Sequence, residues 1–266
     1  MKISVFYQHL LDAAAQQEQN IAEMLEFFRK QGVAAAELSM QPLIEDPAIP
    51  ARLQAAGLAI SSIYGACPFA SDPNSDAGLR LVDAAVSAGS RLVMPLPGSY
   101  SPDIPDEQVR ENITIGLSRM VDYAAQAGIT VTIEDFDNPR SPINTSAGML
   151  YFGERIPGLC YTYDTGNFYT VEDPHDAFTA IESRLRHVHG KDVTAKPVYA
   201  ERCFPSITGA PRYSSPFGAG DVDKRTVGAD LRRIGYDGYV TTEFFGVRDY
   251  KAAILDSIRW LHENWL

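Results

Sequence analysis

The chain has 266 residues and a formal net charge of −11, and its length is close to the roughly 250 residues of one (β/α)8 barrel. This acidic balance would repel the phosphates of a nucleic acid and the surface of an anionic membrane, so neither is expected as a partner. A small neutral or carbonyl-bearing molecule is a more suitable substrate.

The chain begins with a strand-like segment. Met1 and Lys2 run directly into the apolar residues 3–7, and no apolar run approaches the length that crosses a membrane. Its cysteines lack the paired spacing of a zinc knuckle or a disulfide framework. They are Cys67, Cys160 and Cys203. We therefore expect a cytoplasmic protein with reduced thiols and no membrane partner.

A glycine followed by a short apolar run recurs along the chain. Glycine adopts at low cost the left-handed conformation that ends a helix, and the next residues begin a strand. This joint is repeated at Gly32, Gly57, Gly89, Gly128, Gly158 and Gly238. The segments before the glycines carry apolar residues at helical spacing, as in the stripe of Ile21, Met24, Leu25 and Phe28.

Predicted strands and helices alternate along the whole chain. The strands lie near residues 2–7, 33–37, 58–63, 90–94, 129–134, 160–164, 185–189 and 239–243. The helices lie near residues 12–31, 47–56, 75–88, 106–127, 144–156, 173–184, 222–234 and 248–264. Strict alternation implies parallel strands with right-handed crossovers, and eight such units favour a closed barrel over an open sheet. We predict a single TIM-barrel domain over residues 1–266.

Four of the predicted strands end in acidic or imidazole side chains, namely Glu134, Asp164, His189 and Glu243. Parallel barrel strands bring these ends to one mouth, where the active sites of such barrels lie. Three carboxylates and one imidazole form a hard ligand set that suits Mn2+, Mg2+, Co2+ or Zn2+. A single polar side chain at a strand end would only mark where the chain leaves the core. Three carboxylates and one histidine at four strand ends predict a divalent metal site.

The alternation of side chains places a polar residue one layer beneath each proposed ligand. These inward-facing residues are Thr132, Thr162, His187 and Thr241. Polar groups at that depth suit a second layer that orients metal ligands through hydrogen bonds.

One segment interrupts the alternation. Residues 194–220 are rich in Pro, Gly, Ser and aromatic residues and show no helical or strand period. A loop of this length inside a compact domain is usually functional or disordered. Because it follows the strand that ends in His189, we expect it to lie over the catalytic face and to wall the substrate pocket; the alternative is an insertion without function.

The ordered motifs resemble the xylose isomerase-like barrels, a group that includes sugar epimerases, hydroxypyruvate isomerase, inosose dehydratase and endonuclease IV. The resemblance covers nearly the whole chain and is carried by residues 132–134, 164–167, 187–192, 218–223 and 235–243. Each motif alone is weak. The ordered set is specific for the superfamily and not for a substrate.

In the epimerase and isomerase branches, the resemblance implies that Glu134, Asp164, His189 and Glu243 hold one divalent ion, with Mn2+ favoured. The ion would grip the carbonyl and the adjacent hydroxyl of a ketose or hydroxy-ketone. Glu134 and Glu243 would stand on opposite sides of the carbon that loses a proton, one acting as base and the other returning the proton. A cation beside the developing enediolate would stabilise its charge.

Three further residues near the proposed ligands are candidates for substrate binding. Sugar epimerases often carry a His three residues after the metal Asp, and this chain has Asn167, which can hydrogen-bond a hydroxyl but cannot transfer a proton near neutral pH. Lys191 would contact substrate oxygens, or else pair with Asp192. Arg202 is a candidate for binding a substrate phosphate or carboxylate, and a phosphate is left open because the chain has no glycine-rich phosphate loop.

Tyr7 and His9 follow the first strand and would point toward the same mouth if the strand register holds. They are therefore candidate substrate-binding residues as well. Their alternatives are a packing tyrosine whose hydroxyl is satisfied and a solvated loop histidine.

The leading hypothesis is a metal-dependent isomerase or epimerase of a small sugar, ketose or hydroxy-ketone. A lyase that dehydrates a keto-inositol would use the same metal site, and a non-catalytic sugar-binding barrel would share only the fold. An endonuclease IV-like role would need a His-rich zinc cluster and a basic face, whereas this chain is acidic and has five His. A homo-oligomer is left open.

Overall fold

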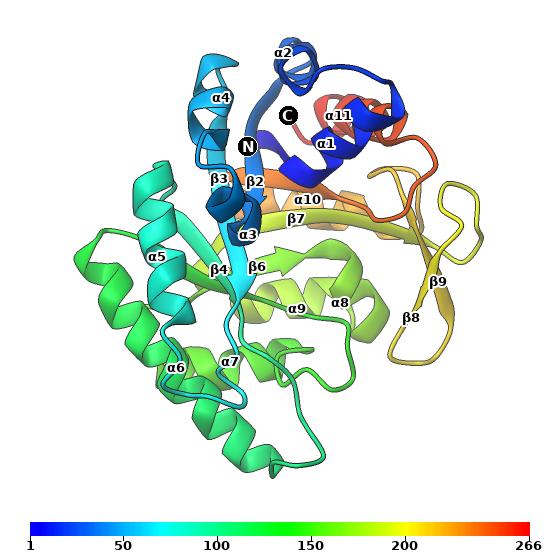
Figure 1. Cartoon of the computed structure of the whole chain (residues 1–266). Helices are drawn as coiled ribbons and strands as arrows, with labels where there is room; N and C mark the ends of the chain where they lie inside the picture. The colour runs from blue at the N-terminus through cyan, green and yellow to red at the C-terminus, as the bar shows by residue number, and fades with distance from the viewer.

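Eight parallel strands form a closed barrel that is surrounded by helices (Figure 1). This computed structural model describes residues 1–266 apart from the side chain of Pro205. The barrel strands are β1 (Lys2–Phe6), β2 (Val33–Ser39), β3 (Ala59–Ala66), β4 (Leu92–Leu96), β5 (Thr130–Glu134), β6 (Cys160–Asp164), β7 (Leu185–Thr194) and β10 (Tyr239–Glu243). Strands β1 to β7 pair in chain order, and β10 closes the barrel between β7 and β1. The predicted TIM barrel is confirmed.

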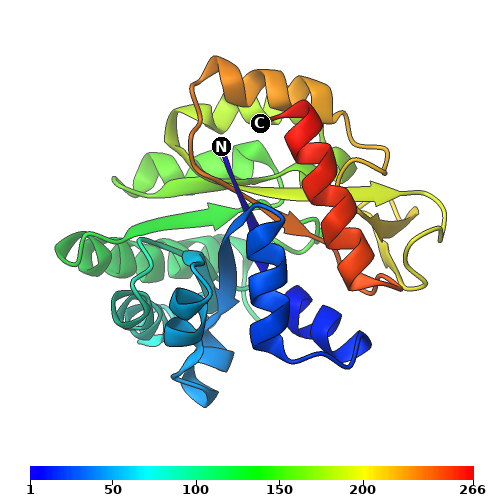
Figure 2. The same cartoon turned by 90° about the horizontal axis from the view of Figure 1, so that it is seen from above.

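Helices pack around the outside of the barrel, as the view from above shows (Figure 2). They are α1 (Tyr7–Gln16), α2 (Ile21–Lys30), α3 (Met40–Glu45), α4 (Ile49–Ala55), α5 (Ala77–Ala88), α6 (Asp106–Gln126), α7 (Ser146–Arg155), α8 (Thr165–Val171), α9 (Pro174–Ile181), the 3-10 turn η1 (Glu182–Arg184), α10 (Lys224–Arg233) and α11 (Tyr250–Asn264). Their apolar stripes face the strands, so that Phe28, Leu81 and Leu231 are fully buried. Burying each such side chain contributes about 2 kcal/mol. None of the helices in the described chain combines the length and the apolar character that crossing a bilayer requires.

The predicted helix over residues 12–31 is divided into two in the structure. Helix α1 ends at Gln16, and Glu18 has a φ of 52°, which is incompatible with continued helix. The side chain of Asn20 then accepts the Ala22 N–H at 2.8 Å and caps α2. The intervening Gln and Glu residues are good helix formers, so propensity alone did not indicate the break.

The glycine joints lie mostly where the sequence pattern predicts them. Five of the six glycines have positive φ, including Gly89 with 77° at the end of α5. The sixth joint is shifted, because α10 ends at Arg233 and Gly235 takes the left-handed conformation with a φ of 67°. Gly238 was therefore the wrong glycine for this joint.

The segment 194–220 contains a hairpin that the sequence pattern did not indicate. Strand β7 continues beyond the barrel to Thr194, and the short strands β8 (Cys203–Pro205) and β9 (Pro211–Ser215) add to this extension. Both added pairings are antiparallel. The hairpin lies at the right of Figure 1, beyond the carboxyl end of β7.

Asp192 anchors the chain where it returns from the hairpin to the barrel. Its carboxylate is fully buried, pairs with Lys224 at 2.8 Å and accepts three backbone N–H groups from residues 218–222. A Cβ atom at Gly220 would lie 2.2 Å from Asp192 Oδ1, so this close approach requires glycine. Asp192 therefore holds the loop, and its ion-pair partner is Lys224, not the neighbouring Lys191.

Replacing Asp192 by Asn should lower the free energy of unfolding by about 3 kcal/mol, because the change leaves the buried Lys224 ammonium without its counter-charge. Chemical denaturation followed by circular dichroism measures this loss. Asp221→Asn, at an exposed neighbour in the same segment, is the matched control and should cost less than about 1 kcal/mol. Equal stability of the two variants would contradict the anchoring role.

Candidate metal centre

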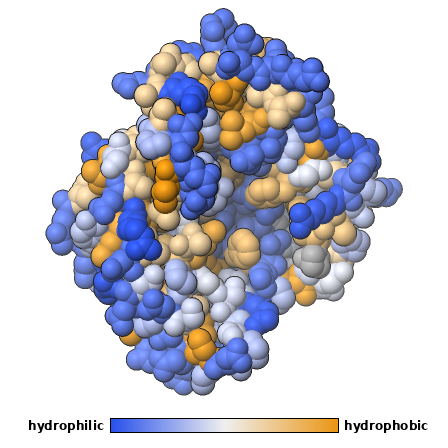
Figure 3. Space-filling view, in the orientation of Figure 1, coloured by the Kyte–Doolittle hydropathy of each residue, from blue (hydrophilic) through white to orange (hydrophobic). Residues whose placement is uncertain are grey.

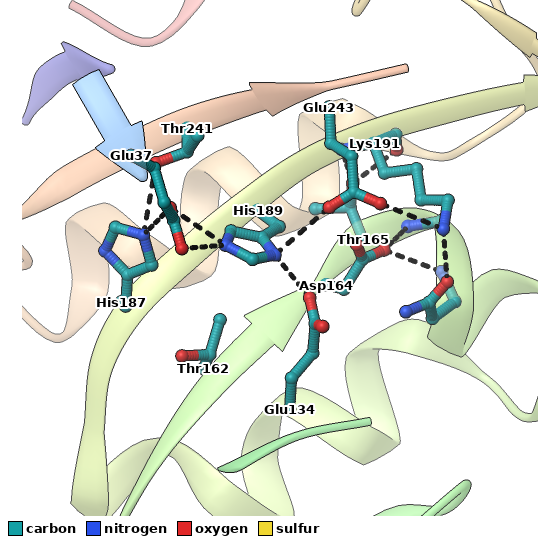
Figure 4. Close-up of polar contacts among 12 residues, drawn as sticks. Glu37, Glu134, Thr162, Asp164, Thr165, His187, His189, Lys191, Thr241 and Glu243 are labelled. Carbon is teal, nitrogen blue, oxygen red and sulfur yellow. Dashed lines mark hydrogen bonds and ion pairs between the residues drawn. The ribbon is translucent and has the colours of Figure 1, made fainter. Parts of the chain in front are cut away.

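The four proposed ligands meet at the carboxyl ends of strands β5, β6, β7 and β10 (Figure 4). Glu134, Asp164 and Glu243 are the last residues of their strands, and His189 lies within the long strand β7. Each side chain offers a ligand atom, and these atoms all lie within 4.8 Å of one another. All four residues are buried, with exposures of 8% or less. The barrel thus gathers three carboxylates and one imidazole in a site removed from water.

One oxygen of the Asp164 carboxylate accepts hydrogen bonds, and the other has no hydrogen-bond partner in the described part of the chain. Helix α8 begins directly after this residue, and Oδ1 accepts the N–H of Gly166 at 2.8 Å and of Asn167 at 2.7 Å. Oδ2 is buried and has no hydrogen-bond partner among the described residues. A buried acceptor without a partner is costly, and a cation would satisfy it. The donor set therefore fits a divalent ion.

The His189 ring lies between Glu37 on one side and Glu134 and Glu243 on the other (Figure 4). Its Nδ1 contacts Glu134 and lies 3.2 Å from Glu243 Oε2, whereas its Nε2 lies 3.1 Å from Glu37 Oε2. With an ion in the cluster, an Nε2–H that donates to Glu37 would leave the Nδ1 lone pair free to coordinate the ion. Burial alone would lower the pKa of His189, but Glu134 and Glu37 raise it well above its ordinary value.

Glu37 is a member of the site that the sequence prediction missed. It lies on β2, is 1% exposed and accepts a hydrogen bond from His187 Nε2 at 2.7 Å in addition to its contact with His189. Burial would raise the pKa of Glu37, but the two imidazoles outweigh burial and lower it far below its usual range. Glu37 ends the apolar run 33–37, so it carried the same signal as the predicted ligands.

The polar layer beneath the site is formed by hydroxyl groups and the second histidine. His187 Nε2 lies 3.1 Å from Thr241 Oγ1, which extends the network that starts at Glu37. Thr162 donates to Thr132 at 2.8 Å, so these two threonines bond to each other and not to the carboxylates above them. This network therefore reaches one proposed ligand, His189, through the chain of hydrogen bonds from His187 to Glu37 to His189.

Lys191 brings a buried positive charge to the same cluster. Its Nζ lies 3.2 Å from Glu243 Oε1 and donates to Asn167 Oδ1 at 2.7 Å. Burial would raise the pKa of Glu243, but Lys191 and His189 outweigh it and lower the pKa to about 2. For Glu134, burial is the largest effect and raises the pKa. The two glutamates therefore differ in their affinity for a proton.

A cavity of about 330 Å3 opens beside these side chains. Its polar lining consists of Glu134, Asp137, His189, Lys191 and Glu243. Its apolar lining consists of Phe6, Tyr64, Met94, Leu96, Phe136, Phe204 and Phe245. In Figure 3 the surface is hollowed near the centre of this face, and hydrophobic residues form parts of the rim. Phe204 belongs to β8, so the segment 194–220 contributes to the pocket wall.

Two predicted substrate-binding residues, Tyr7 and His9, lie outside this lining because the chain enters α1 directly after Phe6. Tyr7 accepts a hydrogen bond from Arg52 at 3.1 Å, and Phe6 lines the pocket in its place. His9 is 1% exposed and stacks on Phe244 with ring centroids 4.7 Å apart. Burial lowers the pKa of His9 to about 4, so its ring is neutral. His9 lies beside the carboxyl end of β10, where its Nε2 accepts the Phe244 N–H at 3.3 Å, so it is a buried residue behind the pocket wall and not a solvated loop residue.

The other predicted substrate-binding residues occupy different positions. Lys191 lines the cavity. Asn167 is 2% exposed, and its amide bonds to Lys191 and, at 2.7 Å, to the carbonyl of Asp135, so it supports the lysine from behind. Arg202 is exposed in the segment that precedes β8 and lies outside the lining of the cavity.

The closed barrel and the buried cluster of Glu, Asp and His side chains define a TIM-barrel protein with a candidate metal centre. The family model for xylose isomerase-like TIM barrels matches residues 11–264. The chain belongs to this family, and the resemblance inferred from its motifs is confirmed. No curated protein sequence gives a significant match.

Solved structures share the fold at low sequence identity. The probable 3-DHS dehydratase AsbF from Bacillus anthracis has a TM-score of 0.75 and 17% identity, over 98% of this chain and 99% of that one. A D-allulose 3-epimerase from Methylomonas sp. has a TM-score of 0.75 and 17% identity, over 99% and 98%. The 3-keto-D-glucoside 4-epimerase YcjR from E. coli has a TM-score of 0.70 and 19% identity, over 92% and 94%.

Proposed function

We propose that this protein is a divalent-metal-dependent isomerase or epimerase of a small sugar, ketose or hydroxy-ketone. The observation that carries the proposal is the partnerless buried oxygen of Asp164, within a cluster whose ligand atoms lie within 4.8 Å of one another. The adjoining cavity of about 330 Å3 has the size of a small-molecule site. The sugar epimerases among the structural neighbours support this class of reaction.

The residues that would hold the ion are Glu134, Asp164, His189 and Glu243. We favour Mn2+ over Mg2+, Co2+ and Zn2+, because three carboxylates and one imidazole combine ligands that suit hard and borderline ions. When bound, such an ion supplies a positive charge that polarises the substrate carbonyl and offsets the negative charge of the enediolate. Phe204 and Phe245 would keep water away from this reactive species.

Glu134 and Glu243 are the proposed pair that moves the proton. In the barrel, β5 and β10 are separated by β6 and β7, so the two carboxylates enter the cavity from different sides. Lys191 keeps Glu243 ionised and therefore free to accept a proton, while the same positive charge weakens it as a base. Burial favours the protonated form of Glu134, which suits a donor. Removal of a proton on one face of a carbon and return on the other is epimerisation.

A dehydratase at the same site is the second candidate. The neighbour described as a probable dehydratase and the allulose epimerase have equal TM-scores of 0.75. Both reactions begin with proton abstraction beside a carbonyl. They diverge when a neighbouring hydroxyl leaves as water and a carbon–carbon double bond forms.

Metal analysis of the purified protein, followed by incubation in D2O with Mn2+ and a panel of ketoses, inososes and hydroxypyruvate, tests the proposal. We expect a sugar of unchanged composition that carries deuterium at the carbon beside the carbonyl. A product lighter by one water would assign the dehydratase. Intact ligands without turnover across the panel would leave a non-catalytic sugar-binding barrel and contradict both enzymes.

A further inference from the structure

The metal cavity adjoins a second, smaller chamber. This side chamber has a volume of about 130 Å3 and shares Leu96, Glu134 and Phe136 with the metal cavity. The rest of its lining comes from the end of β4 with the loop after it and from the segment before α7, namely Pro95, Pro97, Gly98, Ser99, Ser141 and Ile143. A molecule at the metal ligands can therefore extend past Glu134 into the side chamber.

The side chamber is apolar and carries no positive charge in its lining. Among the described residues that line it, Glu134 is the one charged side chain. An anionic group at this position would face that carboxylate without a cation to balance it. An uncharged group is therefore the suitable occupant of the chamber.

Large apolar side chains at the entrance remain open to solvent. Leu96 is 36% exposed and Phe136 is 44% exposed, and both stand between the two cavities. Phe245, on the metal cavity, is 47% exposed. Exposed apolar residues that gather beside a polar site usually mark a binding surface. An all-polar ketose would leave these side chains uncovered, whereas an apolar substituent would cover them.

We propose that the substrate carries an uncharged apolar group, of the size of a phenyl ring or a short branched alkyl chain, that binds in the side chamber. The chamber volume of about 130 Å3 is close to the roughly 150 Å3 of an apolar cavity that binds benzene. The proposal rests on the proposed function in one respect, since the hydroxy-ketone end of the molecule lies at the metal ligands. It names the substrate class as hydroxy-ketones that bear an apolar substituent.

The test compares ligands that differ only in the substituent. Binding to the Mn2+-supplemented protein is measured by calorimetry for the methyl and phenyl glycosides of 3-keto-glucose, and for hydroxyacetone and 1-hydroxy-3-phenylpropan-2-one. We expect the phenyl member of at least one pair to bind at least about tenfold more tightly, which corresponds to about 1.4 kcal/mol. Ser99→Trp, which fills the chamber, should abolish this preference. Ser71→Trp, at an exposed residue after β3 outside both linings, should retain it.

Equal binding within both pairs would overturn the proposal, and so would a phenyl preference that survives in Ser99→Trp. If Ser99→Trp instead converts a dimer into a monomer, the chamber belongs to a contact between copies and the proposal is wrong. These outcomes are separate from the test of the proposed function. A phenyl preference without turnover in D2O would support the side chamber as a binding site and reject the isomerase. Turnover of small ketoses without a phenyl preference would support the isomerase and reject the side chamber as a binding site.

Discussion

Replacing Glu243 by Gln should reduce turnover by a factor on the order of 100 or more while part of the metal affinity is retained. Glutamine keeps an oxygen ligand and the shape of the side chain, but it removes the carboxylate that accepts the proton. The same change at Glu134 should have a similar effect, because the two residues act on opposite sides of one carbon. Turnover of the substrate identified in the D2O screen and metal content are measured on each variant.

The matched control is Glu263→Gln, at an exposed glutamate on α11, which should leave turnover unchanged. Solvent deuterium in the product reports on the proton transfer itself. If Glu243→Gln bound metal and retained nearly full activity, the mechanism with two carboxylates would be wrong. If either variant loses its metal completely, its activity is measured again with excess metal. Activity that excess metal restores would show that the glutamate acts only as a ligand, which would also contradict its role as base.

Glu37→Gln should weaken metal binding by about 10-fold to 100-fold although this residue is not one of the four proposed ligands. The Glu37 carboxylate accepts hydrogen bonds from both His187 and His189, and an amide at this position would present its NH2 group to one of the two imidazoles. His189 would then lose the partner that holds its Nδ1 toward the other ligands. Titration of the metal-free protein with Mn2+ measures the change.

Glu23→Gln on α2, an exposed glutamate, is the control for this experiment and should bind Mn2+ like the unaltered protein. Thermal unfolding of the metal-free variants distinguishes positioning from stability. An unchanged affinity in Glu37→Gln would show that packing alone orients His189. A loss of affinity that matches a general loss of folded protein would equally contradict the positioning role.

The barrel and the four proposed ligands could be predicted because their signals are local. A strand with alternating side chains that ends in Glu134 or Glu243 can be recognised from five residues, and Gly128 before β5 can be recognised in the same way. Glu37 also ends an apolar run, but the three alanines before it have low strand propensity and indicate a strand only weakly. Its role appears only when β2 is placed across the barrel from His187 and His189, which are 150 or more positions away in the chain.

The features that were missed depend on contacts that a local pattern does not contain. Strands β8 and β9 exist because β7 extends past the barrel and offers an edge, while their own residues are rich in proline. Tyr7 lacks a preceding capping side chain, so nothing in the sequence indicated a helix that starts directly after β1. The packing of His9 among aromatic residues includes Phe244, which lies at the other end of the chain.

Successive residues of strand β7 point to opposite faces, so this one strand supplies both side chains of the candidate site and the residue that anchors the hairpin. His187, His189 and Lys191 alternate toward the barrel interior, and Asp192 points to the returning loop. Inserting or deleting one residue within this run would turn the downstream side chains to the opposite faces of the strand. Such a change would displace the proposed ligand His189, the loop anchor Asp192, or both. We therefore expect changes of length to be tolerated in the turns beyond Thr194, where the pocket wall can change without moving His189 and Lys191 to another face of β7.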